Sequence, residues 1–343
     1  EQGFAVRAIS PPRPEVEELL SEGIDVRTIR MTRTISPFKD LISLIRLVRE
    51  IRQFKPDILH THTPKAGLLG MLAAWWCKVP VRMHTVAGLV WMEEGGLKKK
   101  LLVLTERITY ACATGVYPNS LGLKSFMETT TGTRTPLRVI GAGSSNGINI
   151  GTFTSSAELD ERARSLRKQY AVDDDTILFG FVGRVVRDKG VNELVAAFDA
   201  VSRKVKSKLI LAGPFEDDLD PISDETRNLL KHNVNIVVLG YVDDVRPLLR
   251  ASDVFVFPSY GEGFPNVVLQ ACAMECPCIV SDINGCNEII QHGVNGLIVP
   301  PKNVPMLVEA MVTMGTQNDK RKMFATRARE FVVERYDQEN VGV

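Results

Sequence analysis

Residues 253–271 read DVFVF-PSYGEGFP-NVVLQA. A short apolar run ends at Pro258 and a second apolar run begins at Asn266, an order that predicts a buried strand, a loop and a helix. Glycines in the loop let the backbone approach a ligand closely, and the first turn of the helix offers unpaired N–H groups to an anion. Any α/β protein can contain one such unit, so this pattern alone predicts a fold class and no more.

A second loop of the same kind lies upstream, where residues 181–190 read FVGRVVRDKG. Arg184 presents a planar fork of donors and Lys189 a compact ammonium group, and their spacing lets both point at one anion. Two solvated surface charges are the common alternative. Because the pair directly follows a buried strand, we favour an anion-binding role for both residues, whereas Arg187 can equally be an exposed charge.

Taken together, the two loops resemble the GT-B-fold retaining glycosyltransferases of family 4, which use sugar nucleotides as donors. The matching motifs are G-R…D-K-G at residues 183–190, E-G-F-P-N at 262–266 and N-G-x-x-E-I-I…G-x-N-G at 284–296. The resemblance implies transfer of a sugar, with retention, from a nucleotide sugar such as a UDP-sugar to a polyprenyl-linked glycan of a bacterial capsule or O-antigen. It also implies catalysis without a metal cofactor, so that fixed cations and backbone N–H groups must neutralise the leaving diphosphate.

The resemblance assigns roles to residues of the second half. Glu262 is expected to contact hydroxyls of the donor sugar and to be catalytic, together with Arg184 and Lys189. The remaining donor-binding residues are expected to be Gly183, Gly263, Phe264, Pro265, Asn266 and Gln270. Family members carry a glutamate where this chain has Gln270, and an amide can still accept from one ribose hydroxyl and donate to another.

In the first half of the chain, two histidines lie where a predicted strand ends and a loop begins, in residues 60–67, which read HTHTPKAG. We interpret His60 as a hydrogen-bonded core residue, whereas His62 and Lys65 follow the strand, where open α/β sheets bind ligands, and are assigned to the acceptor side. By resemblance, His84 faces the donor and is catalytic. Ser145 and Asn146 lie in a small-residue segment and are placed on the acceptor side, although a plain linker explains them almost as well.

Alternating strands and helices predict parallel sheets covered on both faces, in an α/β chain of two Rossmann-like, doubly wound domains facing across a cleft. We expect an acceptor-binding domain at residues 1–150, a nucleotide-sugar-binding domain at 151–325, and a last helix at 326–343 that crosses back. Short strands are expected near Val116 and Val139. Because the first expected strand follows only three residues, we also expect a natural β–α unit of roughly 20–35 residues ahead of Glu1.

The amino-acid composition limits the classes of binding partner and the cellular compartments that we expect. The chain has 343 residues, 44% of them hydrophobic, and a formal net charge of +1, which gives no sign of a nucleic-acid partner. Its longest apolar stretches have the length of strands, short of the roughly 20 residues that span a bilayer. The six cysteines lie in apolar segments rather than in a metal or disulfide pattern, which favours a reduced, cytoplasmic protein.

Contact with the inner face of the cell membrane is a further expectation. Leu89, Trp91 and Met92 precede the basic triplet 98–100, and such a segment either inserts at an anionic membrane surface or is an ordinary core helix with a basic start. Two other functions remain open for the whole chain. One is a nucleotide-sugar 2-epimerase of the same fold, and the other is a non-catalytic sugar-nucleotide-binding protein.

Overall fold

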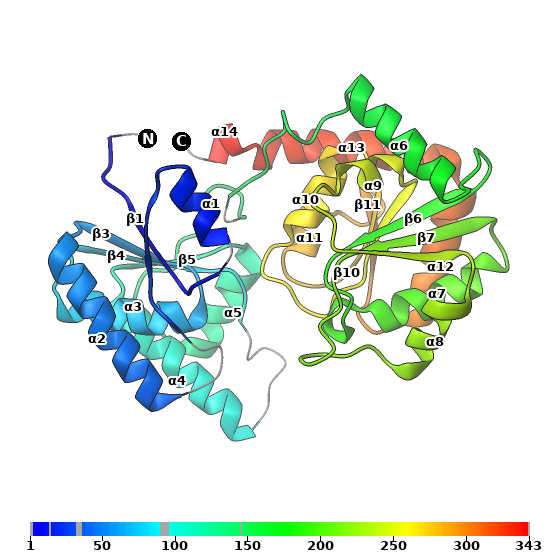
Figure 1. The fold of residues 1–343 in the computed structure, drawn as a ribbon. Coiled ribbons are helices and arrows are strands. Elements are labelled where there is room, and N and C mark those ends of the chain that lie inside the picture. Colours follow the sequence, from blue (N-terminus) through cyan, green and yellow to red (C-terminus); the bar gives the residue numbers. More distant parts are fainter. Residues whose placement is uncertain (1–2, 14, 32–35, 90–95, 145, 342–343) are drawn as a thin grey trace. The chain divides into compact units, whose positions relative to one another are not determined.

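The computed structural model describes residues 3–13, 15–31, 36–89, 96–144 and 146–341, and the chain divides into two compact units (Figure 1). The first unit comprises Glu1–Pro118 and Lys124–Arg138, and the second comprises Asn119–Leu123 and Val139–Val343. The main segment of the second unit thus begins at residue 139, whereas the sequence analysis expected residue 151, and the unit also takes in residues 119–123. The expected return of residues 326–343 to the first domain stays a prediction, as does a β–α unit ahead of Glu1.

The second unit is a doubly wound α/β domain. Its six strands are all parallel, in the order β11-β10-β9-β6-β7-β8. The chain winds outward from β6 through β7 and β8, returns to β9, and winds outward on the other side through β10 and β11. Its elements are α6 (Ala157–Gln169), β6 (Ile177–Val182), the 3-10 turn η2 (Arg187–Lys189), α7 (Val191–Ser202), β7 (Ser207–Ala212), α8 (Asp224–His232), β8 (Ile236–Gly240), α9 (Arg246–Ala251), β9 (Val254–Phe257), α10 (Asn266–Ala273), β10 (Cys278–Ser281), α11 (Cys286–Ile289), β11 (Gly296–Val299), α12 (Val304–Thr316), α13 (Asn318–Tyr336) and α14 (Gln338–Val341).

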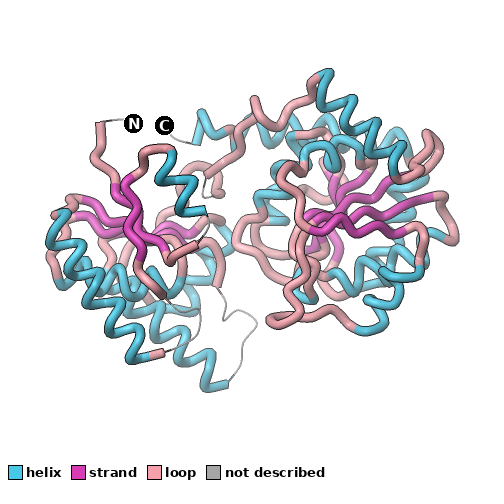
Figure 2. Tube along the Cα trace, viewed as in Figure 1, coloured by secondary structure: helices cyan, strands magenta, loops and turns pink. Residues whose placement is uncertain are grey.

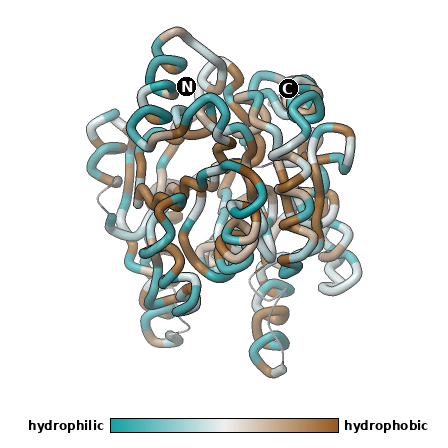
Figure 3. The backbone as a smooth tube through the Cα atoms, turned by 90° about the vertical axis from the view of Figure 1, so that its right-hand side faces the viewer, coloured by the Kyte–Doolittle hydropathy of each residue, from teal (hydrophilic) through white to brown (hydrophobic). Residues whose placement is uncertain are grey.

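Burial explains why these segments form strands and helices. All four residues of β9 and of β10 are buried, as expected for strands of a parallel sheet that helices cover on both faces. Helices α7, α8 and α12 lie on one face, and α6, α9, α10 and α13 on the other (Figures 1 and 2). Helix α7 buries Val191, Leu194 and Phe198 at helical spacing. In Figure 3 the hydrophobic segments run through the interior, and hydrophilic segments lie on outer helices and loops.

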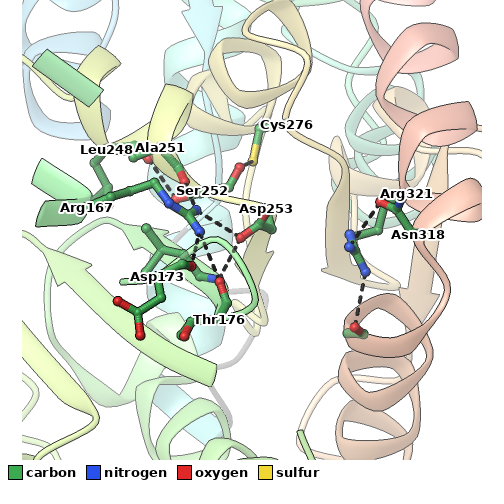
Figure 4. A network of polar contacts seen from close by, with 12 residues as sticks. Arg167, Asp173, Thr176, Leu248, Ala251, Ser252, Asp253, Cys276, Asn318 and Arg321 are labelled. Carbon is green, nitrogen blue, oxygen red and sulfur yellow. Dashed lines mark hydrogen bonds and ion pairs between the residues drawn. The ribbon is translucent and has the colours of Figure 1, made fainter. Parts of the chain in front are cut away.

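A polar network fixes where β6 and β9 begin (Figure 4). The Arg167 guanidinium of α6 donates to the Ala251 carbonyl at 2.8 Å and to the Asp253 carboxylate at 3.0 Å. The same carboxylate accepts the backbone N–H of Leu178 in β6 at 2.8 Å. One arginine therefore links α6 to the starts of both central strands, and charge-assisted hydrogen bonds of this kind are the stronger ones in proteins.

The first unit also contains parallel strands only. They form a three-stranded sheet in the order β3-β4-β5 and a separate pair, β1-β2. Helix α2 packs against α3, which packs against α4, and these helices enclose a core that includes Leu47, Ile51 and Leu69. Its elements are β1 (Arg7–Ser10), α1 (Glu15–Ser21), β2 (Asp25–Thr28), α2 (Pro37–Phe54), β3 (Ile58–Thr61), α3 (Pro64–Trp76), β4 (Val81–Val86), α4 (Gly96–Cys112), β5 (Gly115–Pro118) and, continuing from the second unit, α5 (Leu121–Thr131).

Two sequence expectations require comment. The strand expected near Val139 is wrong: a single bridge joins Leu137 to Val116 in β5, because the polar, proline-containing residues around it form no continuous ladder. The six cysteines are free thiols as expected, and five of them are buried. Burial raises the pKa of the Cys276, Cys278 and Cys286 thiols, so these groups stay neutral core residues.

The loops after β6 and β9 touch at a position that only glycine can occupy. Gly190 has φ +68°, and a Cβ added there would lie 2.0 Å from the Pro258 carbonyl oxygen. We expect Gly190→Ala to lower the free energy of unfolding by at least about 2 kcal/mol, because backbone strain and a steric clash add. The matched control is Gly240→Ala, with φ +71° and no atom within 4 Å, which carries only the strain. Equal losses in urea unfolding would show that the contact imposes no constraint.

Candidate active site

The candidate donor site lies where the winding of the second unit reverses. Strands β6 and β9 are neighbours, so their carboxyl-terminal loops meet at the topological switch point, the usual ligand site of such sheets. The loops are joined directly: the Tyr260 N–H donates to the Asp188 carbonyl at 2.9 Å, and the Ser259 hydroxyl donates to the same carbonyl at 3.3 Å. Two motifs about 70 residues apart in the chain therefore form one surface.

Lys189 and Glu262 form an ion pair at the centre of this surface. Their side chains are only 15% and 17% exposed, so the pair is largely withdrawn from water. The Ser259 hydroxyl also donates to the Glu262 carboxylate, at 2.9 Å. The structure thus brings together the cation and the acid that the sequence predicted separately, and it adds Ser259, which the sequence analysis missed although it lies directly after the predicted strand.

Arg184 lies beside this pair and is held by acids of the same loop region. Its guanidinium donates to Glu216 at 2.6 Å and to Asp188 at 3.3 Å, and its side chain is 40% exposed. Arg187 is 66% exposed and pairs with Asp220 at 3.0 Å. The sequence analysis missed Glu216 and Asp220, because the loop after β7 carries several acids and no spacing marks which of them turn inward.

Of the remaining predicted donor residues, Gly183 lies directly after β6 and the others follow Glu262. Gly263, Phe264 and Pro265 are buried, and the Phe264 ring packs on Tyr336 with 5.3 Å between ring centroids. The Phe264 side chain is therefore a core group, and its expected contact with a ligand is limited to the backbone. Asn266 opens α10 and is exposed, and Gln270 is half-buried one turn further along the same helix.

The N-G-x-x-E motif has a structural role that the sequence analysis did not identify. The Glu288 carboxylate accepts the backbone N–H groups of Leu121 and Gly122 at 2.8 and 2.9 Å. These are the first amides of α5, which have no partner within the helix, and an acid at a helix start also interacts favourably with the helix dipole. Glu288 thus caps helix α5, although it belongs to α11 and lies far from α5 in the sequence.

In the first unit, three histidines gather around the carboxyl end of β3, because Thr61 at that end is the register partner of His84 in β4. His84 is 2% exposed, and its Nδ1 lies 2.8 Å from the Thr61 hydroxyl. Burial, and then the nearby His60 and His62, lower the pKa of His84 to about 4, so its ring is neutral at pH 7. A Cβ at Gly67 of α3 would lie 2.4 Å from the His84 ring, so the glycine provides the space that this histidine needs.

The other first-unit residues partly correct the expectations. His60 bonds to the Thr85 hydroxyl at 2.8 Å but is exposed, so its interpretation as a core residue is wrong: it lies at the open end of its strand. His62 is exposed, with its ring centroid 4.1 Å from that of His60. Lys65 pairs with Asp40 of α2 at 2.7 Å.

The expected acceptor residues near the linker receive less support. Asn146 is exposed and belongs to the second unit, and Ser145 lies outside the described residues. The segment is anchored to the end of α13, because the Ile148 N–H donates to the Tyr336 carbonyl at 2.7 Å. Gly147 and Ile148 thus have a structural role, because the Gly147 N–H also donates to the Ser144 hydroxyl at 3.2 Å. The assignment of Ser145 and Asn146 to the acceptor side stays a prediction.

The two cations of the donor surface differ in what their removal should do. Lys189→Ala leaves the shielded Glu262 carboxylate without its partner, so we expect it to cost about 1–3 kcal/mol of unfolding free energy. Arg184→Ala removes a more exposed group and should cost less than about 1 kcal/mol. Both variants should weaken UDP binding by roughly 10- to 150-fold. Urea unfolding and titration calorimetry measure the two effects, and wild-type affinity in either variant would remove that residue from the site.

Burial of a neutral histidine makes stability depend on pH. The unfolded chain has a histidine pKa near 6.5, against about 4 for His84 in the fold, so the unfolded state binds more protons as the pH falls between these values. This difference in proton binding should make the free energy of unfolding about 2 kcal/mol lower at pH 5 than at pH 7. His84→Asn should therefore lose less melting temperature on acidification than the wild type. His232→Asn, which changes an exposed histidine, is the control, and an unchanged profile for His84→Asn would contradict the assignment.

Comparisons with known proteins agree with this architecture. Residues 1–143 match the model of a glycosyl transferase 4-like domain, and residues 176–317 match glycosyl transferases group 1. The capsular polysaccharide biosynthesis glycosyltransferase CapM of Staphylococcus aureus is 32% identical over 313 residues, which are 91% of this chain and 81% of that protein. An Escherichia coli UDP-Gal:alpha-D-GlcNAc-diphosphoundecaprenol alpha-1,3-galactosyltransferase is 28% identical, over 82% of this chain and 72% of the relative.

Solved structures share the fold. Anabaena HepE, crystallised with UDP and glucose, superposes with a TM-score of 0.82 at 20% identity. The superposition covers 98% of this chain and 89% of the HepE chain. WaaG, a glycosyltransferase involved in lipopolysaccharide biosynthesis, superposes with a TM-score of 0.73 at 15% identity, over 99% and 90%. The predicted fold of two Rossmann-like domains is confirmed. The chain belongs to the family-4 glycosyltransferases of GT-B fold, which include bacterial enzymes of capsule and O-antigen synthesis.

Proposed function

We propose that this glycosyltransferase moves a sugar, with retention, from a UDP-sugar to a polyprenyl-linked glycan in the synthesis of a bacterial surface polysaccharide. The observation that carries the proposal is the Lys189–Glu262 pair at the switch point of the second unit. Lys189 offers a cation to the diphosphate, and Glu262 offers a carboxylate to the hydroxyls of the sugar. The E. coli relative, whose name specifies UDP-Gal and a diphosphoundecaprenol acceptor, supports the substrate classes.

In the proposed reaction, the bond between the anomeric carbon and the diphosphate oxygen breaks, and negative charge grows on that oxygen. We assign the stabilisation of this charge to Lys189 and Arg184, because cations that ion pairs already hold in position can act without reorganisation. We assign the neutralisation of the leaving group to these residues and to loop amides, without a metal ion. Among the described residues, no group of three His, Cys, Asp or Glu side chains is arranged to hold a metal.

For retention, we propose that the acceptor oxygen bonds to the anomeric carbon on the face from which the diphosphate departs. The acceptor hydroxyl gives its proton to the departing phosphate oxygen, so that atoms and charge balance without a separate protein base. Glu262 would hold sugar hydroxyls during this step, and Gln270 would bind the ribose through its amide. The neutral His84 can donate one N–H hydrogen bond, and its catalytic role stays a prediction.

We place the reaction at the inner face of the cell membrane, where a polyprenyl-linked acceptor would be presented. The free thiols favour a reducing compartment. No helix among the described residues is long and apolar enough to cross a bilayer. The basic triplet 98–100 begins α4 and fits the expected membrane contact, whereas Trp91 and Met92 lie outside the described residues.

Incubation with UDP-, GDP- and ADP-sugars, with and without an undecaprenyl-diphosphate-linked sugar, tests the proposal. We expect product only when both the acceptor and a UDP-sugar are present, and we expect it to form even when EDTA is added. NMR should show that the product keeps the anomeric configuration of the donor. An epimerised donor without acceptor would identify an epimerase, and a thermal shift without turnover would identify a binding protein. An inverted product would contradict the stereochemistry alone.

Glu262→Gln should lower turnover more than it weakens UDP binding, because the acid is assigned to the reacting sugar rather than to the nucleotide. We expect kcat to fall by about 10- to 1000-fold while the Kd for UDP changes by less than about tenfold. Glu225→Gln, an exposed acid on α8, is the matched control and should leave both values unchanged. Unaltered turnover in Glu262→Gln would remove this residue from the reaction.

A further inference from the structure

Three of the five histidines of the chain lie together in the first unit, where β3 ends beside β4 (Figure 1). His60 belongs to β3 and His62 follows that strand directly, and their ring centroids are 4.1 Å apart. His84 of β4 is bonded to the hydroxyl of the residue between them, Thr61, at 2.8 Å. We name His60, His62 and His84 the histidine cluster.

The histidine cluster is neutral in the free protein at pH 7. Partial burial, and then the neighbouring His62, lower the pKa of His60 to about 4, and partial burial also lowers the pKa of His62. The pKa of His84 is lowered to about 4 by burial, and then by the other two histidines. Each member thus disfavours protonation of the others, because like charges at short distance favour the neutral form.

His60 and His62 keep hydrogen-bonding capacity at the open end of the strand. The Nε2 of His60 lies 2.8 Å from the Thr85 hydroxyl, which leaves its Nδ1. Within the parts of the chain that the structure describes, no hydrogen bond reaches this Nδ1 or either ring nitrogen of His62. Both residues are exposed, so a ligand can reach these nitrogens, and a protonated ring nitrogen donates to an oxygen acceptor.

The other titratable groups around the histidine cluster have partners or are buried. Lys65 of α3 pairs with Asp40 of α2 at 2.7 Å, so its charge is already compensated in the fold. From α4, the Tyr110 ring centroid lies 6.0 Å from that of His84, and Glu106 is buried one turn earlier. Burial raises the pKa of both groups, which favours their neutral forms. The histidines are therefore the groups through which this strand end can gain positive charge.

An anion placed against His60 and His62 would reverse the effect that keeps them neutral. A close opposite charge typically moves a pKa by about 1 to 3 toward the charged form, so a pKa near 4 would approach the physiological range. The imidazolium then makes charge-assisted hydrogen bonds to phosphate oxygens, which are stronger than neutral ones. An anion with two charges, such as a diphosphate, is the ligand that this response favours most.

We propose that His60 and His62 bind the diphosphate of the lipid-linked acceptor, and that a proton moves from the solvent to this pair as the diphosphate binds. The inference rests on the proposed function, which supplies an acceptor of this chemistry. It gives the first unit a phosphate site of its own, with other residues than Lys189 and Arg184 of the second unit. Because a proton is taken up, acceptor binding becomes tighter as the pH falls.

Titration calorimetry on the full chain tests the proposal. The probe is a diphosphate diester with one methyl group and one short prenyl chain, which keeps its two charges between pH 6 and pH 8. Saturating UDP fills the proposed donor site throughout. Measurements at both pH values, in two buffers of different ionisation enthalpy, give the affinity and the number of protons taken up. His62→Asn and His60→Asn are compared with the wild type, and His232→Asn, an exposed histidine of the second unit, is the matched control.

We expect the wild type and His232→Asn to bind the probe about three- to fivefold more tightly at pH 6 than at pH 8, with uptake of about 0.3 to 1 proton at pH 6. His62→Asn and His60→Asn should bind it at least about fivefold more weakly at pH 6, with less proton uptake and an unchanged Kd for UDP. Circular dichroism confirms folding, and His62→Asn, at an exposed position, decides the matter if His60→Asn is unfolded. Wild-type affinity and proton uptake in folded His62→Asn, or no binding of the probe to the wild type, would overturn the proposal.

Transfer assays separate this proposal from the proposed function. We expect the KM for a lipid-linked acceptor to rise from pH 6 to pH 8 in the wild type and to be higher in His62→Asn. If sugar is transferred with a KM that depends neither on pH nor on His62, the diphosphate site is wrong and the proposed function stands. If the probe binds with proton uptake but no donor and acceptor give a product, the diphosphate site stands and the proposed function is wrong.

Discussion

The donor surface depends on the close approach of two loops that leave neighbouring strands of one parallel sheet. The sheet order places β6 beside β9, and Gly190, without a side chain, lets its loop reach the Pro258 carbonyl. Once the loops touch, Lys189 and Glu262 become neighbours in a region with little access to water. The electrostatics of the surface thus follow from a steric condition on the backbone.

Shielding also explains why the cations of this surface are arranged with acids around them. An isolated buried ammonium group would be costly, and Glu262 provides the compensating charge for Lys189. Glu216 and Asp188 pair with the more exposed guanidinium of Arg184. Both cations are held by side chains of the loops after β6, β7 and β9: Lys189 by Glu262, and Arg184 by Glu216 and Asp188. Ion pairs therefore fix the side chains of this surface before any ligand binds.

The first unit has a buried neutral histidine in place of a buried ion pair. His84 is kept neutral by burial, and the absence of a side chain at Gly67 allows its ring to lie against α3. Helix α2 of the same unit exposes apolar residues such as Phe38 and Leu41, while its acids Asp40 and Glu50 pair with Lys65 and Arg7.

The sequence by itself determined the fold class, nearly all helices and strands, and the residues of the donor loops, because apolar periodicity, glycine and proline act locally. It predicted Lys189 and Glu262 but could not predict their ion pair, since nothing in a linear pattern states which of two loops 73 residues apart will touch. Glu216 as a partner of Arg184, Glu288 as the cap of α5 and the exposure of His60 were likewise decided by tertiary structure. The physical reason is that burial and long-range pairing are properties of packed elements rather than of the segments that form them.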